Sequence, residues 1–418
     1  MSFSKSRVFL ICALAAFFYL YEFLVRVIPS AMLQPMMAHF HVGIATAGWL
    51  SGAFFFGYVP MQIPSGMLLD SIGGRRVLAL ATLLCAISCA LFAYVKIVAL
   101  ALALRFLMGF TGSVAFTGAL FVASGWIPRR YFGFYSGLVQ TLGCVGAILG
   151  QAPVAKLQQH FGYSTTQLGI GIVGVVFALL IFIFVRDPVT NDRARGQQVL
   201  HTRKHLLLRL LTVIKNKQNR VIGLYVFLTW APVNIIASLW GIPFLMRKFA
   251  MPAQTAGAFM ALAWVGVAIS SPLIAAWSSK AKDRTLSMLL CVLLGFISIS
   301  IILYSPNLSH SMLAVLLFVF GWQAAGQPIA FDLAYNNNQQ SNLGTALGYT
   351  NMATIAGGML LQPLVGMLIA WHAGHHLQHL SSYSLSDFHV ALLVAPLCML
   401  LNIFVIIFLL DKKLHKAA

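Results

Sequence analysis

The sequence predicts an all-α membrane protein of twelve transmembrane helices arranged in two six-helix bundles. Of the 418 residues, 60% are hydrophobic and only 8% are charged, a composition typical of integral membrane proteins. Several apolar runs are longer than eighteen residues, which is enough to cross a bilayer as a helix. These runs are rich in Leu, Ala, Gly and Phe and do not alternate as barrel strands do, so helices satisfy the backbone in lipid better.

Apolar runs and the breaks between them define the twelve spans. We place them at residues 8–33, 46–69, 77–95, 97–125, 132–155, 166–185, 221–245, 255–277, 286–304, 312–335, 345–371 and 388–410. An even number of spans leaves both termini on one side of the membrane. With the N-terminus inside, 21 Lys and Arg residues fall on inner segments and four on outer loops. The positive-inside rule therefore predicts cytoplasmic termini.

The net charge of +19 has a membrane explanation. The positive residues are spread over several short inner loops, where they meet anionic lipid. A nucleic-acid surface would gather them on one face. We therefore expect membrane lipid, a small solute and protons as partners, no nucleic acid, and a monomer.

One long polar segment, residues 186–220, divides the chain. We predict an N-terminal six-helix bundle at 1–185, a cytoplasmic linker at 186–220 and a C-terminal six-helix bundle at 221–418. Within the linker, Leu206, Leu207, Leu210, Leu211 and Ile214 share one helical face beside basic residues. This pattern predicts an amphipathic helix on the inner membrane surface; a partner-binding helix is the alternative.

The two halves of the chain repeat each other. At an offset of 209 residues, Gly57 matches Gly266 and Arg75 matches Arg284. At an offset of 211, Gly146 matches Gly357, Gln151 matches Gln362, and Gln140 meets the similar Asn351. Two similar units along one chain are typical of secondary transporters, whose solute site lies between the repeats near the midplane.

The loop after the second span, GMLLDSIGGRR, contains Gly66, Asp70, Gly73, Arg75 and Arg76. We expect Gly66 to allow close helix contact and Gly73 to turn the chain, while Asp70 pairs with an arginine or caps a helix. The pattern resembles the signature loop of the major facilitator superfamily. That resemblance implies the fold of this superfamily and a gating role for the loop on the inner side.

Other stretches agree with this resemblance in part. Ser71 departs from the signature, which has a basic residue there, and WSSKAKDR, ending at Arg284, is a degenerate second copy that we add to the gate. Arg105 in RFLMGFTGS resembles the arginine motif of the fourth helix, where a buried cation influences proton binding. YEFLVR, GYVPMQIPSG and WGIPFLM resemble facilitators of intracellular proteobacteria, among them the intraphagosomal amino-acid transporters. That resemblance implies a location in the bacterial inner membrane.

Three charged residues are predicted to lie inside the bilayer. Glu22 and Arg26 are four residues apart in the first span, and Arg105 reaches a similar depth from the fourth. A charge at this depth is costly, so it faces a partner or a cavity and marks a proton or solute path. We predict that these three residues couple solute movement to protons. The alternative is a structural i, i+4 pair that neutralises itself on one helix.

Uncharged polar and aromatic side chains within the spans are candidates for the solute site. Amides in membrane helices line such sites or form interhelical hydrogen bonds, and both interpretations stay open for each residue. Gln151 and Gln362 are the preferred pair because the repeat matches them. The candidates are Tyr21, Gln140, Gln151, Trp230, Asn234, Trp240, Gln323, Gln327, Asn351 and Gln362.

The outer loop HAGHHLQHLSSYSLSD carries four histidines, His372, His375, His376 and His379. Such a cluster binds a metal or senses acid. The run offers only Asp387 as an acidic partner, so we favour a solvated polar loop and predict neither a metal nor a cofactor.

These patterns favour a secondary active transporter that moves a small hydrophilic solute, an amino acid or organic acid, by proton symport and alternating access. A drug or siderophore exporter using proton antiport is one alternative. A non-transporting membrane sensor or scaffold is another. The sequence contains no phosphate-binding GxxxxGK loop, so we expect neither an ATP-driven pump nor an enzyme.

Overall fold

The computed structural model describes residues 5–187, 208, 210–280, 284–339, 342–374 and 379–410. Within these ranges the chain is helical and contains no β-strand. Twelve helices in the described part are long and apolar enough to cross a membrane. Each of the twelve overlaps one of the predicted spans, which confirms the all-α membrane fold. Most of the predicted linker, 188–207 and residue 209, lies outside the described residues.

The chain divides into two compact units. Unit 1 contains Met1–Ile28 and Ala53–Leu206, and unit 2 contains Pro29–Gly52 and Leu207–Ala418. A short early segment thus belongs to the second unit. The chain passes from the first unit to the second at Pro29 within α1, returns after Gly52 within α3, and passes over again at Leu207.

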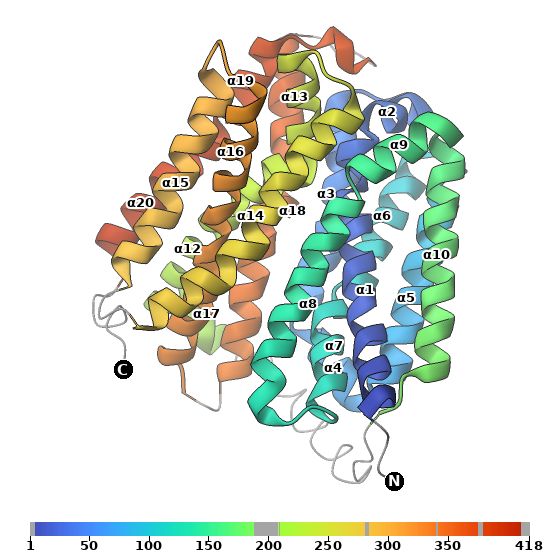
Figure 1. Cartoon of the computed structure of the whole chain (residues 1–418), viewed down its shortest axis with the longest axis vertical. Helices are drawn as coiled ribbons and strands as arrows, with labels where there is room; N and C mark the ends of the chain where they lie inside the picture. Colours follow the sequence, from blue (N-terminus) through green and yellow to red (C-terminus); the bar gives the residue numbers. More distant parts are fainter. Residues whose placement is uncertain are drawn as a thin grey trace. The chain divides into compact units, whose positions relative to one another are not determined.

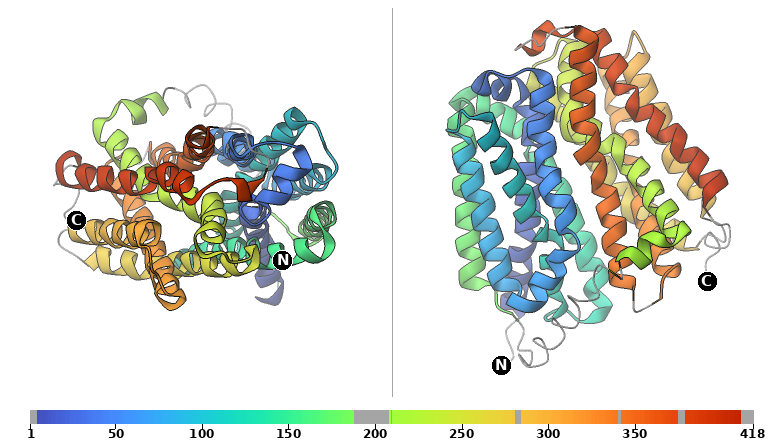
Figure 2. Two further views of the ribbon diagram at one scale, coloured as in Figure 1. Left: turned by 90° about the horizontal axis from the view of Figure 1, so that it is seen from above. Right: turned by 180° about the vertical axis from the view of Figure 1, so that it is seen from behind.

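Unit 1 holds most of the first ten helices (Figure 1). Figures 1 and 2 show α5 and α10 side by side in this unit, where they make extensive contact. The helices of the N-terminal half are α1 (Lys5–Ala31), α2 (Leu33–Phe40), α3 (Ile44–Met61), α4 (Pro64–Ile72), α5 (Gly74–Phe92), α6 (Val98–Gly112), α7 (Val114–Ser124), α8 (Arg129–Leu149), α9 (Ala152–Phe161) and α10 (Tyr163–Phe184).

Unit 2 contains the helices of the C-terminal half together with α2 and the first half of α3. Its most extensive contact joins α12 to α18. The helices are α12 (Lys217–Ile235), η1 (Ile236–Trp240), α13 (Gly241–Phe249), α14 (Ala253–Lys280), α15 (Thr285–Tyr304), α16 (His310–Gly321), η2 (Trp322–Ala325), α17 (Gly326–Asn336), α18 (Leu343–Ala373), η3 (Leu380–Ser382), α19 (Leu385–Leu392), α20 (Val394–Phe404) and η4 (Val405–Leu409).

The second predicted span, 46–69, is not one continuous helix. Helix α3 ends at Met61, and α4 begins at Pro64 after a short break. Pro60 and Pro64 explain the interruption, because proline cannot donate the i to i−4 hydrogen bond and restricts the residue before it. Hydropathy does not reveal this break because GYVPMQIPSG contains no charged residue.

The same helix crossing occurs once in each unit. A Cβ added to Gly57 would clash with the carbonyl oxygen of Phe106, and one added to Gly266 would clash with that of Phe318. In return, Gly109 lies against the Phe54 carbonyl and Gly321 against the Ala263 carbonyl. Only glycine permits such close backbone approach between membrane helices. The recurrence of both contacts supports the duplication predicted from sequence.

A second contact follows the predicted offset of 211 residues. In unit 1, Gly146 of α8 lies against the backbone of Leu20 in α1, and in unit 2, Gly357 of α18 lies against that of Ala231 in α12. Leu20 and Ala231 are themselves 211 residues apart. The first helices of the two halves therefore occupy equivalent places in their units.

Candidate functional site

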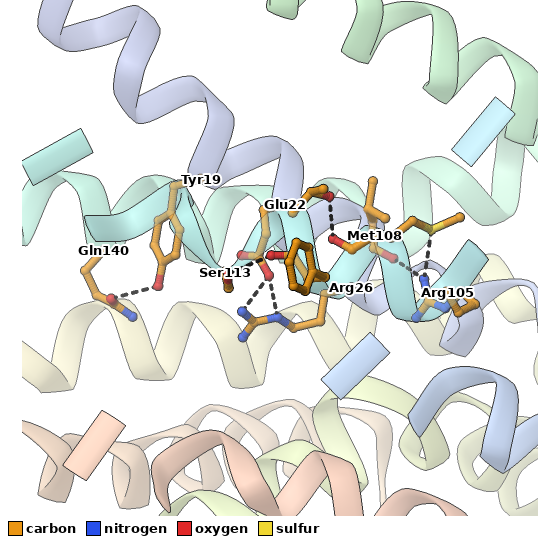
Figure 3. Close-up of polar contacts among 10 residues, drawn as sticks. Tyr19, Glu22, Arg26, Arg105, Met108, Ser113 and Gln140 are labelled. Atoms are coloured by element: carbon orange, nitrogen blue, oxygen red, sulfur yellow. Dashed lines mark hydrogen bonds and ion pairs between the residues drawn. The ribbon is translucent and has the colours of Figure 1, made fainter. Parts of the chain in front are cut away.

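The charged part of the site begins with an ion pair on α1. The Nε and Nη2 atoms of Arg26 donate to Oε1 of Glu22 at 2.9 and 2.6 Å. Figure 3 shows the two side chains facing each other. Both are buried, with exposed fractions of 0% for Glu22 and 4% for Arg26. The i, i+4 pair is confirmed, but it uses only one carboxylate oxygen: Oε2 of Glu22 is buried without a hydrogen-bond partner among the described residues.

Four aromatic rings surround the Arg26 guanidinium. Its central carbon lies 4.1 Å from the ring centre of Phe23, 4.8 Å from Tyr58, 5.8 Å from Phe55 and 5.9 Å from Phe54. Aromatic faces attract a cation, most strongly away from water. This aromatic cage gives Arg26 favourable contacts in addition to the ion pair with Glu22.

Glu22 is also confined on its other side. A Cβ added to Gly112 at the end of α6 would lie 2.9 Å from Cγ of Glu22. One turn earlier on α1, the hydroxyl of Tyr19 donates to Oε1 of Gln140 at 3.2 Å, as Figure 3 shows. Glycine at position 112 thus leaves the room that the glutamate side chain occupies.

Arg105 approaches the same region from α6. Its Nη1 donates to the backbone carbonyl of Val25 at 3.0 Å and contacts the sulfur of Met108 at 3.8 Å. Its guanidinium carbon lies 5.1 Å from the ring centre of Phe54, the ring that also faces Arg26. The structure thus brings the three predicted charged residues into one buried region of unit 1.

Unit 2 contains a buried amide cluster around Gln362 of α18. Oε1 of Gln362 accepts from the hydroxyl of Ser51 at 2.8 Å, and its Nε2 donates to the carbonyl of Asn234 at 2.8 Å. The indole Nε1 of Trp240 donates to the Gln362 carbonyl at 3.1 Å, and Nδ2 of Asn234 donates to the carbonyl of Thr354 at 3.2 Å. Three predicted solute-site residues therefore meet in one cluster.

Sequence reasoning missed Ser51, which belongs to this cluster. Ser51 lies in α3 between Gly48 and Gly52, and a Cβ at Gly52 would lie 2.6 Å from Cγ of Pro363. The four-residue spacing of the two glycines is the small-residue pattern by which membrane helices pack closely. That pattern is visible in the sequence and was the available signal.

The remaining solute candidates belong to both units. The hydroxyl of Tyr21 donates to the carbonyl of Ile170 at 3.3 Å, which makes it an interhelical contact within unit 1. Gln151, Gln323 and Trp230 are buried, whereas Gln327 and Asn351 are partly exposed.

The signature loop of the first half is organised by Asp187. Gly73 has φ of +95°, which confirms the expected turn. Directly after it, the backbone N–H of Arg75 donates to Oδ1 of Asp187 at 3.0 Å, and Nε of Arg75 donates to the Phe182 carbonyl at 2.8 Å. The carboxylate thus lies at the N-terminus of α5, where the helix dipole favours negative charge.

The other predicted gate residues do not contact Asp187 through any hydrogen bond given above. Asp70 and Arg76 are exposed, and in the matching place of the second half Arg284 forms an ion pair with Asp332. The close contact expected at Gly66 is not present among the described residues, because a Cβ there would meet nothing within 4 Å. Gly66 lies in the short helix α4, which the two prolines separate from α3.

The predicted histidine cluster is only partly described. Nδ1 of His372 lies 2.6 Å from Oδ1 of Asp387, and Asp387 also accepts from the backbone N–H of Ser384. His375 and His376 lie outside the described residues. Within the described ranges, no three His, Cys, Asp or Glu side chains are grouped as metal ligands would be.

Known proteins resemble this chain over most of its length. A family model described as "Major Facilitator Superfamily" matches residues 11–363. The uncharacterized transporter YybO of Bacillus subtilis (strain 168) is 22% identical over 368 residues, covering 82% of this chain and 83% of the relative. The probable galactarate/D-glucarate transporter GarP of Escherichia coli (strain K12) is 21% identical over 378 residues, covering 78% and 81%. A solved bacterial homologue of the human lysosomal transporter Spinster, in an inward-facing and occupied conformation, has a TM-score of 0.78 at 14% identity and covers 97% of each chain.

Proposed function

We propose that this chain, which belongs to the Major Facilitator Superfamily, is a proton symporter that imports a small carboxylate-bearing solute across the bacterial inner membrane. General transport follows from the family. The proton coupling, the direction, the cytoplasmic termini and the solute class are our proposal. The observation that carries it is the buried Glu22–Arg26 pair with one unsatisfied carboxylate oxygen.

Protonation and ion pairing exclude each other at Glu22. A protonated carboxyl group no longer neutralises Arg26, yet the aromatic cage still holds the guanidinium in the same place. Glu22 is therefore a group whose protonation changes the charge of the region without dismantling it. A proton-coupling site needs this property, a change of charge with little change of structure, in a protein that alternates between inward and outward access.

The charge balance favours a carboxylate solute. The buried region contains one carboxylate, Glu22, and two guanidinium groups, Arg26 and Arg105. When Glu22 binds a proton, two buried cations remain, and an anionic group on the solute offsets part of that costly charge. Both favoured solute classes carry a carboxylate. The GarP similarity supports organic acids, and the resemblance to intraphagosomal transporters supports amino acids.

The two units are proposed to have different tasks. Unit 1 provides the charged coupling region, and unit 2 provides the amide cluster of Ser51, Asn234, Trp240 and Gln362. We propose that this cluster binds the uncharged polar part of the solute when alternation between the inward and outward states exposes it. Asp70, Arg75 and the Arg284–Asp332 pair are assigned to the inner gate.

Purified protein in liposomes tests this function directly. We would add labelled D-glucarate, amino acids or a siderophore to one compartment and make that compartment the more acidic one. Protein-free liposomes serve as the control. We expect accumulation of a carboxylate solute that disappears when a protonophore collapses the gradient. Movement of a siderophore or drug opposite to the proton flow would instead establish export by antiport. If no tested solute moves, whichever compartment is the more acidic, the transport proposal is wrong and a sensor or scaffold is favoured.

A further inference from the structure

The last turn of α1 has a carbonyl group without a helical donor. Pro29 lies inside α1, and because proline has no backbone N–H, it cannot donate to the carbonyl four residues earlier, that of Val25. Arg105 of α6 supplies this missing hydrogen bond with Nη1 at 3.0 Å. Its side chain is only 2% exposed. A charged donor thus satisfies a buried acceptor that the proline has left open, a contact expensive to lose away from water.

Arg105 also lies at the second point where the chain passes between the units. Its guanidinium faces the ring of Phe54 at 5.1 Å, and Phe54 follows Gly52, the last residue of the segment assigned to unit 2. Gly109, one turn after Arg105 on α6, lies against the backbone of Phe54. One turn of α6 therefore contacts the chain close to Pro29 and close to Gly52, the first two points where it passes between the units.

We propose that Arg105 is a positioning residue for α1. It fixes the turn in which Pro29 leaves the Val25 carbonyl without a helical donor, and it thereby sets the orientation of the Glu22 and Arg26 side chains. The carbonyl it binds belongs to Val25, the residue directly before Arg26. This role differs from that of a second counter-charge for Glu22, because it depends on the hydrogen bond to the backbone. The inference rests on the proposed transport function for its activity readout.

A double-mutant cycle separates the two roles. Arg105→Met keeps an unbranched, flexible side chain that is shorter than that of arginine and removes every donor. We expect transport to fall about tenfold or more, as for loss of a buried charge-assisted hydrogen bond. Pro29→Ala places an N–H at position 29, so the Val25 carbonyl regains its helical donor. The Arg105→Met/Pro29→Ala double variant is therefore expected to recover part of the lost transport, while the part that depends on the buried Arg105 cation stays lost.

The matched control is Pro60→Ala in the Arg105→Met background. Pro60 also lies inside a helix, α3, but an N–H there serves the carbonyl of Phe56 and not that of Val25. We expect no recovery from this change. Recovery with Pro60→Ala would show a general effect of removing a helix proline and would overturn the assignment.

Thermal unfolding of the purified variants keeps the test decisive if Arg105→Met folds poorly. The positioning role predicts that Pro29→Ala restores the unfolding temperature lost in Arg105→Met and that Pro60→Ala does not. If Pro29→Ala restores neither transport nor stability, Arg105 acts through its charge and the inference is wrong. If wild type transports no tested solute, the proposed function fails, while the stability cycle still decides the role of Arg105.

Discussion

Glu22 is the sole glutamate of the sequence, and it lies fully buried beside a cation that four aromatic rings surround. Its spacing from Arg26 predicted the pair, because residues i and i+4 are neighbours on a helix. The aromatic cage was not predictable. Phe54, Phe55 and Tyr58 belong to α3, and nothing in their own segment distinguishes them from ordinary apolar residues of a membrane helix.

The backbone contact of Arg105 shows another limit of sequence reasoning at this scale. A buried arginine suggests a charged partner, and the sequence offered Glu22. The structure shows that the guanidinium donates to a backbone carbonyl, that of Val25. Its cause, Pro29, is visible in the sequence, but which helix reaches the freed carbonyl depends on packing between α1 and α6.

Gln362 gives a test at the level of one residue. Gln362→Leu leaves the Ser51 hydroxyl and the Asn234 carbonyl without their partner, and each unsatisfied buried group costs about 1–3 kcal/mol. Ser51→Ala removes a single hydrogen bond and is expected to cost about 0.5–1.5 kcal/mol. Thermal unfolding in detergent should rank the two variants in that order. Equal unfolding temperatures for wild type and Gln362→Leu would mean that the amide cluster does not stabilise unit 2.

Among the elements, the twelve spans were predictable because hydropathy and length determine them. Breaks within a span were less visible. The interruption between α3 and α4 depends on Pro60 and Pro64 inside a stretch without charged residues. The π-helical turn η1 at Ile236–Trp240 likewise follows Pro232 without any charged residue. Local backbone geometry, unlike membrane insertion, is set by single residues that leave average hydropathy unchanged.

The glycine crossings provide a prediction for helix pairs. Gly109→Ala and Gly321→Ala each place a Cβ against a backbone carbonyl that cannot move aside, and overpacking of this kind costs about 1–3 kcal/mol. Gly137→Ala in α8 is the matched control, because a Cβ there meets nothing within 4 Å. We expect lower unfolding temperatures for the first two variants and no loss for the third. A Gly137→Ala variant as unstable as the others would contradict the crossing argument.

The duplication is the main feature of the whole molecule that sequence offsets predicted. The offset that relates Gly146 to Gly357 also relates Glu22 to Val233 and Arg26 to Ala237. The charged pair of unit 1 is therefore replaced by small apolar residues at the equivalent place in unit 2. Duplicated folds thus carry different chemistry, and this asymmetry supports assigning proton coupling to unit 1.

The division of the chain into units was less predictable than the repeat. The sequence marks the middle of the chain by a polar segment, and that signal predicted bundles at 1–185 and 221–418. The structure assigns Pro29–Gly52 to the later unit. Contacts such as that of Ser51 with Gln362, 311 residues away, leave no trace in local composition, so only the three-dimensional packing reveals them.

Replacing Glu22 with glutamine tests the central claim most directly. Glu22→Gln imitates the protonated acid and removes the proton site, while Glu22→Asp keeps a titratable carboxyl group as the control. In proteoliposomes supplied only with a pH difference, Glu22→Gln should fail to accumulate solute yet still exchange it between equal compartments. Glu22→Asp should retain some accumulation. If Glu22→Gln concentrates solute as wild type does, Glu22 is a structural partner of Arg26 and the proton is carried elsewhere.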